Sequence, residues 1–195
     1  MNLLAAAWIL LQPVAPAADA GCLDAAAADP VAARVVARLA AELSAPPARV
    51  LACPDGRWEV RWPNYQQHGD WRKSARGHCR SRPGPDGVVL DRCRVAIDAH
   101  HPGLPHPIRL GHDLPLSRVR EVVDVLAGGL PPDQRIWQLD FTTVRDGGAW
   151  SEEHYGYKVQ TVRAGGGSGH VLRVYRDCAP SPCVWAWRKI SEWVS

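Results

Sequence analysis

Residues 57–62 read Arg-Trp-Glu-Val-Arg-Trp, and this stretch decides the fold class. Large apolar side chains alternate here with charged ones. Successive side chains of a β-strand point to opposite faces, so the pattern predicts a strand with one apolar face and one charged face. Antiparallel sheets commonly bury one face and leave the other in water.

Further strands are predicted on the C-terminal side of this stretch. Pro83-Gly84-Pro85-Asp86-Gly87 is a strong turn signal, and the residues on either side of it are expected to pair as a hairpin. Other runs of strand-forming residues are separated by Gly-rich or Pro-rich turns. The predicted strands after the first are 74–82, 88–98, 135–144, 153–163, 170–177 and 183–190.

Two helices are predicted. Asp29-Pro30 is a favourable helix start, with Asp as N-cap and Pro at the first helical position, and apolar residues then recur at helical spacing through to Ser44. A second helix is expected to begin with Ser117 as N-cap and to end at Gly128-Gly129. The expected class is therefore α+β, with two helices packed on a mainly antiparallel, disulfide-stabilised sheet.

The two halves of the chain resemble each other. Each has a helix, a Pro-Pro pair, an Arg followed by apolar residues and then strands, which suggests a duplicated α-β-β-β unit; chance similarity is the competing explanation. The predicted organisation is a first half at 21–99, a His- and Pro-rich connector at 100–114 and a second half at 115–195, and together they are expected to form one compact domain. The connector's prolines argue against regular helix and central strand.

The N-terminus predicts export. Residues 3–11 form an apolar run too short to span a bilayer, and residues 15–17 and 18–20 are small-residue cleavage patterns. We therefore expect residues 1–20 to be a signal peptide and the mature chain to be periplasmic or secreted. Lipidation of Cys22 is the less favoured alternative. No later apolar stretch approaches the length of a membrane span.

All six cysteines follow this predicted signal, in a compartment where disulfides form. Two of the pairings follow from predicted turns. Cys178 and Cys183 bracket a turn, and Cys79 and Cys93 lie on opposite arms of the predicted hairpin. The third follows by exclusion. The favoured scheme is Cys22–Cys53, Cys79–Cys93 and Cys178–Cys183, with zinc ligation and a catalytic thiol as disfavoured alternatives.

Charge gives little support to a nucleic-acid partner. The formal net charge is +3, and the basic residues are interleaved with acids rather than gathered in a run.

Aromatic composition is the most informative functional signal. The chain has nine Trp and one Phe, and Trp and Arg together are typical of recognition surfaces. We expect a non-enzymatic binding or inhibitor-type module that recognises a protein or an envelope glycan through a sheet face carrying both. The alternative role for these rings is core packing. The candidate ligand-binding residues are Trp58, Trp62, Trp185, Trp187 and Arg188.

Two other functions are weaker candidates. Glu152, Glu153 and His154 follow a Gly-Gly turn at the start of a predicted strand, and with a connector residue such as His112 they could serve a small secreted hydrolase. The alternative is that these are ordinary charged residues at the end of a strand, which give the same sequence pattern without a catalytic role.

The connector could instead hold zinc or copper in a periplasmic metal-binding protein. A Pro-rich loop does not fix ligand geometry, so no metal or other cofactor is expected. The candidate ligands are His100, His101, His106, His112 and Asp113.

Overall fold

The computed structural model describes residues 21–26, 28–41, 43, 45–85, 87–143, 155–177 and 182–195. These residues contain two helices and one sheet of ten strands, so the class is α+β. The first half contains β1 (Leu23–Asp24), α1 (Pro30–Ala40), β2 (Arg49–Ala52), β3 (Arg57–His68), β4 (Trp71–Gly84) and β5 (Gly87–His100). The second contains β6 (Ile108–Leu110), α2 (Leu116–Ala127), β7 (Gln134–Thr143), β8 (Tyr155–Arg163), β9 (Ser168–Asp177) and β10 (Val184–Val194).

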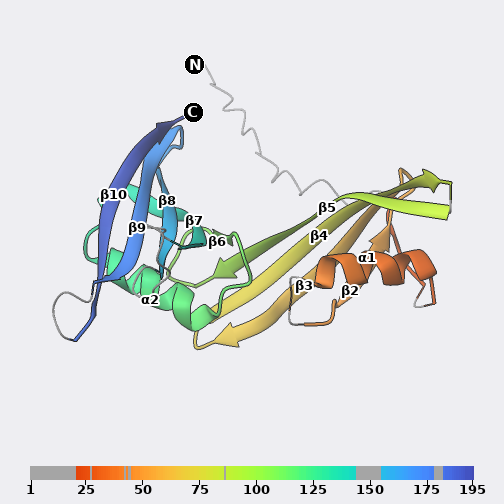
Figure 1. Ribbon diagram of the computed structural model, residues 1–195, viewed down its shortest axis with the longest axis horizontal. Helices are drawn as coiled ribbons and strands as arrows, with labels where there is room; N and C mark the ends of the chain where they lie inside the picture. The colour runs from red at the N-terminus through yellow and green to blue at the C-terminus, as the bar shows by residue number, and fades with distance from the viewer. Residues whose placement is uncertain are drawn as a thin grey trace, which may run out of the picture.

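The strands lie in the sheet in chain order, from β1 to β10. Neighbouring strands pair antiparallel, except that β6 and β7 pair parallel, with α2 in the connection between them. Long strands β3, β4 and β5 extend to one side with α1 alongside them, whereas β7–β10 stand at the other end near α2 (Figure 1).

The predicted alternation along β3 is present, and it places the core. Trp58, Val60 and Trp62 are buried, and they join one hydrophobic cluster with residues of both helices. We call this helix-bearing side of the sheet the covered face. Each buried indole also has a hydrogen-bond acceptor: Trp58 Nε1 donates to Ser81 Oγ (2.9 Å) and Trp62 Nε1 to the Ala45 carbonyl (3.0 Å).

Gly77 lets α1 lie close to the sheet. A Cβ at this position would meet Leu39 Cδ1 at 2.8 Å and the Trp62 ring at 3.2 Å. The absence of a side chain at Gly77 therefore sets how closely α1 approaches β4.

A buried ion pair fixes the junction between the halves. Lys73 on β4 is 1% exposed, and its Nζ lies 2.6 Å from Asp113 Oδ1, just before α2. Tyr65 on β3 donates its hydroxyl to the same oxygen at 2.6 Å. Burial raises the pKa of the Tyr65 phenol, and the hydrogen bond to Asp113 adds to this effect. The charge of Lys73 is therefore compensated within the core.

The start of α1 is as predicted and that of α2 is not. Asp29 caps α1 by accepting hydrogen bonds from the Val31 and Ala32 amides, and the helix ends at Ala40, before Ser44. Helix α2 begins at Leu116, with Pro115 rather than Ser117 at the N-cap position. Leu116 is buried in the core, so its packing draws the helix start two residues further towards the N-terminus.

The expectation that the connector holds no central strand is wrong. Strand β6 lies between β5 and β7, in the middle of the sheet. It begins at Ile108, directly after the last proline of the connector, so each of its residues has an N–H to donate. Ile108 and Leu110 are buried.

Each half has a helix followed by four antiparallel strands, one more than predicted: β2–β5 after α1 and β7–β10 after α2. Sequence duplication and the division into halves stay predictions. The predicted signal peptide lies outside the described residues.

The structure pairs Cys22 with Cys53 and Cys79 with Cys93, two of the pairings that the sequence favours. Cys183 is also disulfide-bonded, and its predicted partner Cys178 lies outside the described residues. The bonds are compatible with an oxidising compartment. Among the described helices, none has the length and apolar character needed to cross a membrane.

Candidate functional site

The side of the sheet opposite to α1 carries arginines. On β3 and β4 the side chains that alternate with the core residues point to this side, and β5 and β6 continue it. We call this surface the arginine face, defined by Arg57, Arg61, Arg76, Arg80, Arg94 and Arg109.

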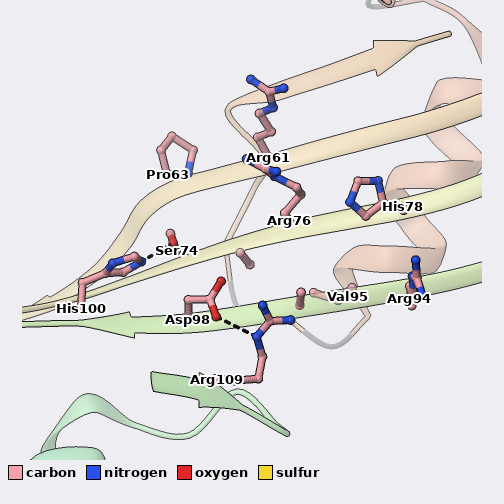
Figure 2. A pocket seen from close by; sticks show the side chains of 12 residues that line it. Arg61, Pro63, Ser74, Arg76, His78, Arg94, Val95, Asp98, His100 and Arg109 are labelled. Atoms are coloured by element: carbon pink, nitrogen blue, oxygen red, sulfur yellow. Dashed lines mark hydrogen bonds and ion pairs between the residues drawn. The ribbon is translucent and has the colours of Figure 1, made fainter. Parts of the chain in front are cut away.

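A groove of about 680 Å³ lies on this face. Figure 2 shows its side chains on β3–β6, with α1 behind the strands. Four arginines and two histidines line it, against one carboxylate, that of Asp98. The basic lining residues are Arg61, Arg76, Arg94, Arg109, His78 and His100. The groove is therefore suited to anionic groups.

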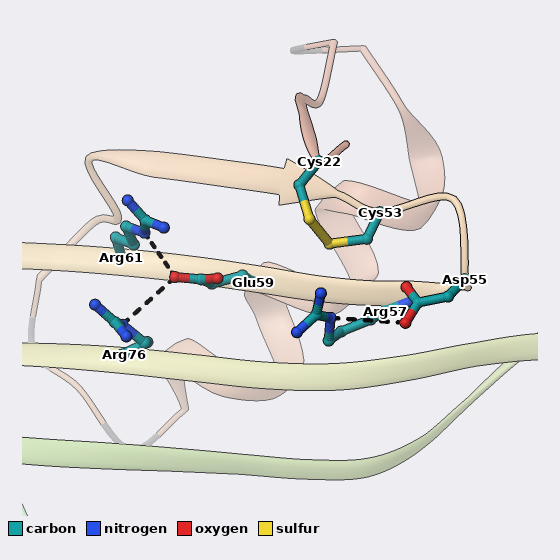
Figure 3. The surroundings of a disulfide bond; sticks show 7 residues. All are labelled: Cys22, Cys53, Asp55, Arg57, Glu59, Arg61 and Arg76. Atoms are coloured by element: carbon teal, nitrogen blue, oxygen red, sulfur yellow. Dashed lines mark hydrogen bonds and ion pairs between the residues drawn. A yellow bond between two sulfur atoms is a disulfide. The ribbon is translucent and has the colours of Figure 1, made fainter. Parts of the chain in front are cut away.

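Glu59 holds two of these arginines in place (Figure 3). Its carboxylate is 6% exposed and lies 2.6 Å from Arg61 Nε and 3.4 Å from Arg76 Nε. Arg61 and Arg76 are themselves directly opposite in the β3–β4 register. The buried acid offsets the repulsion between the two guanidinium groups and orients them.

The other end of the groove is fixed in the same way. Arg109 Nε donates to Asp98 Oδ1 at 2.8 Å, across the β5–β6 pair. Ser74 Oγ and His100 Nε2 lie 2.8 Å apart, joining β4 to β5. Polar side chains at this end are thus positioned by partners on adjacent strands (Figure 2).

A second groove of about 560 Å³ adjoins the first, since both are lined by His78 and Arg94. Its other basic lining residues are Arg57, Arg80 and Arg92, and no acid lines it. Within the described part of the chain, Arg80, Arg92 and Arg94 have no ion-pair partner. This end of the face therefore has uncompensated positive charge.

His78 lies where the two grooves meet. Burial lowers the pKa of its imidazole, and the charges of Arg76, Arg94 and Arg57 lower it further, while Glu59 opposes them. A bound anion would act in the opposite direction and favour the protonated ring.

The structure separates the predicted Trp from the predicted Arg. Trp58 and Trp62 are 7% and 1% exposed beneath α1, so contact with a partner would require the rings to leave the core. The residues that alternate with these tryptophans along β3 are charged and point to the other side of the sheet. The tryptophans therefore lie on the covered face.

Trp185 and Trp187 on β10 are half-buried and pack against the core. Trp187 pairs with the buried Val174, and its ring contacts Gly129 just after α2; Trp185 lies 6.1 Å from Tyr157, centroid to centroid. These tryptophans thus share the covered face.

Arg188, in contrast, lies on the same side of the sheet as the arginine face. It is opposite Arg173 in the β9–β10 register, which is itself opposite Lys158 on β8. Its guanidinium lies 5.9 Å from the centroid of the Tyr175 ring. The same side of the second half therefore also carries basic side chains, together with Asp140 opposite Lys158.

The predicted histidine ligands point to different places. His100 contacts Ser74, and His101 packs against Trp71 with the ring centroids 4.8 Å apart. Asp113 is engaged by Lys73 and Tyr65. His106 and His112 are exposed. No three His, Cys, Asp or Glu side chains in the described ranges are placed to hold a metal ion.

The hydrolase candidates Glu152, Glu153 and His154 lie outside the described residues.

We did not predict the arginine face from the sequence, although the sequence contains a pattern that indicates it. Arg57 and Arg61, and likewise Arg76 and Arg80, recur at even spacing within predicted strands. An even spacing places such residues on one face of a strand. Which face stays open depends on where α1 packs.

Comparison with known proteins gives no relative: no family model, curated protein or solved structure matches this chain.

Proposed function

We propose that this chain is a non-enzymatic binding module of the inhibitor type, which recognises a protein partner through the arginine face. The observation that carries the proposal is the first groove, where Arg61, Arg76 and Arg109 are each held by a carboxylate on their own or an adjacent strand. Side chains ordered before binding lose less conformational entropy when a partner arrives.

Electrostatics supports a partner with an acidic surface. Arg has a planar fork of donors that pairs with carboxylates in two parallel hydrogen bonds. The face joins two grooves of about 680 and 560 Å³, an open surface rather than an enclosed cavity. Such a surface suits a macromolecule more than a small substrate. The predicted export and the disulfides agree with a partner outside the cytoplasm.

The test is retention of a partner from cell-envelope extract by immobilised full chain with its disulfides intact. The double variant Arg80→Ala/Arg94→Ala removes two exposed charges from the arginine face. Arg34→Ala/Arg38→Ala removes the same charge from exposed positions on α1, on the other side of the sheet. Circular dichroism checks that both variants fold.

We expect the parent chain and the α1 variant to retain the same protein, and the arginine-face variant to lose it. Retention should also weaken as salt rises. Equal retention by all three chains would overturn the proposal. Retained material that survives protease treatment would identify a glycan and overturn the protein assignment.

A further inference from the structure

The cations of the arginine face recur along the strands. In the β3–β4 register Arg57 is opposite Arg80, and Arg61 is opposite Arg76. Between these pairs comes the row in which His78 is opposite both Glu59 on β3 and Arg94 on β5. Each two-residue step from Arg57 to Arg61 thus presents at least one guanidinium, at a repeat of about 6.7 Å.

Part of this positive charge destabilises the folded chain when no partner is bound. Like charges directly opposite one another destabilise a sheet, and among the described residues the pair Arg57–Arg80 has one weak counterion, Asp55, at 3.8 Å from Arg57. Arg92 adds a further charge from a β-bulge, where its backbone has a φ of +49°. Bulges re-aim side chains, and strained backbone of this kind concentrates at functional sites.

An extended polypeptide has the same repeat as these rows. Its alternate side chains lie on one face, also about 6.7 Å apart. We infer that the arginine face takes an extended acidic segment of its partner, with Asp or Glu at alternate positions, laid along β3 and β4. The inference rests on the proposed function and specifies the chemistry of the partner.

The dimensions favour such a segment over a single compact anion. The rows from Arg57 to Arg61 span two steps, about 13 Å, and the groove continues to Arg109 on β6. A lone phosphate or sulfate would neutralise one row and leave the others unpaired. A segment with alternate carboxylates places one anion beside each row.

The experiment compares two synthetic nine-residue peptides of identical composition, four Glu and five Thr. One alternates Thr and Glu, and the other has its Glu residues in a continuous block. Binding to the full chain is measured by fluorescence anisotropy at low salt, with heparin as an anionic polysaccharide in a third arm.

We expect the alternating peptide to bind about tenfold more tightly than the blocked one, the effect of roughly one further charge-assisted hydrogen bond. Arg80→Ala/Arg94→Ala should abolish that preference, and Arg34→Ala/Arg38→Ala should leave it unchanged. Equal binding of the two peptides, or a preference that survives the arginine-face variant, would overturn the inference. Tighter binding of heparin than of either peptide would also overturn it.

The two proposals fail separately. If the arginine-face variant loses an envelope protein but the peptides bind equally, the binding function stands and the extended acidic segment is wrong. If the arginine-face variant retains as much protein as the α1 variant and the peptides bind equally, both are wrong.

Discussion

The two faces of β3 are made by alternate residues of one six-residue stretch, and they have opposite surroundings. Trp58, Val60 and Trp62 enter the core beneath α1, whereas Arg57, Glu59 and Arg61 lie on the arginine face. The covered face removes large apolar area from water and so supports the fold. The arginine face keeps charges near water, where surface ion pairs contribute little to stability.

If the arginine face binds a partner as proposed, stability and recognition can be altered independently at adjacent positions of one strand. Substitutions on the covered face should change the free energy of unfolding. Substitutions on the arginine face should change binding, except where a charge is buried.

The largest effect is expected from Trp62→Ala. The ring is 1% exposed, contacts Gly77 and donates a hydrogen bond to Ala45, so its removal leaves a cavity and an unpaired carbonyl. We expect a loss of about 3–5 kcal/mol in the free energy of unfolding, measured by urea denaturation.

The neighbouring variant Arg61→Ala is the matched control, because its side chain lies on the opposite face. It should lower the free energy of unfolding by about 1 kcal/mol, since it breaks a partly buried ion pair whose acid, Glu59, keeps Arg76 as a partner. Equal losses in the two variants would show that the faces are not functionally distinct.

An intermediate effect is expected from Glu59→Gln. This change removes the charge that holds Arg61 and Arg76 and leaves the two guanidinium groups facing each other. We expect a loss of about 1–2 kcal/mol in the free energy of unfolding, together with weaker binding of the partner.

Glu192→Gln provides the comparison for this charge removal. Glu192 is exposed, and its carboxylate accepts a hydrogen bond from Lys189 on the same strand. Removal of this exposed charge should leave the free energy of unfolding nearly unchanged. If the two Gln variants lose the same free energy of unfolding, the burial of Glu59 does not add to the cost of removing its charge.

The smallest effect concerns His78. Burial and nearby arginines lower the pKa of its imidazole in the folded chain. As pH falls below the ordinary histidine value of about 6.5, the unfolded chain therefore takes up a proton that the folded chain resists, and stability falls. Above that value the stability is fully present.

The measurement is the pH dependence of the denaturation midpoint in the parent chain and in His78→Gln. The variant should show a shallower decline between neutral and mildly acidic pH. An unchanged slope would show that His78 has no part in the pH dependence.

Local signals predicted the elements that depend on neighbouring residues. The Asp29-Pro30 cap, the hairpin around 83–87 and the alternation at 57–62 all appear as expected. Expectations that needed distant contacts were less accurate. Burial of Leu116 shifted the start of α2, and pairing with β5 and β7 made a central strand of Ile108–Leu110.

The candidate site shows the same limit. The sequence predicted a recognition surface on a sheet face with both Trp and Arg, and Arg188 lies on the open side. The tryptophans belong to the opposite side, because the helices cover the apolar residues of each strand.

By itself, the sequence determined that the chain forms amphipathic strands and two helices, because the periodicity of apolar residues is a local property of each segment. Only the tertiary structure decided which charges gather into one surface. Arg57 and Arg80 are distant along the chain, and they become neighbours through the register of β3 and β4. That register is set by burial of Trp58 and Trp62 against α1, so the position of the arginines follows from the packing of the opposite face.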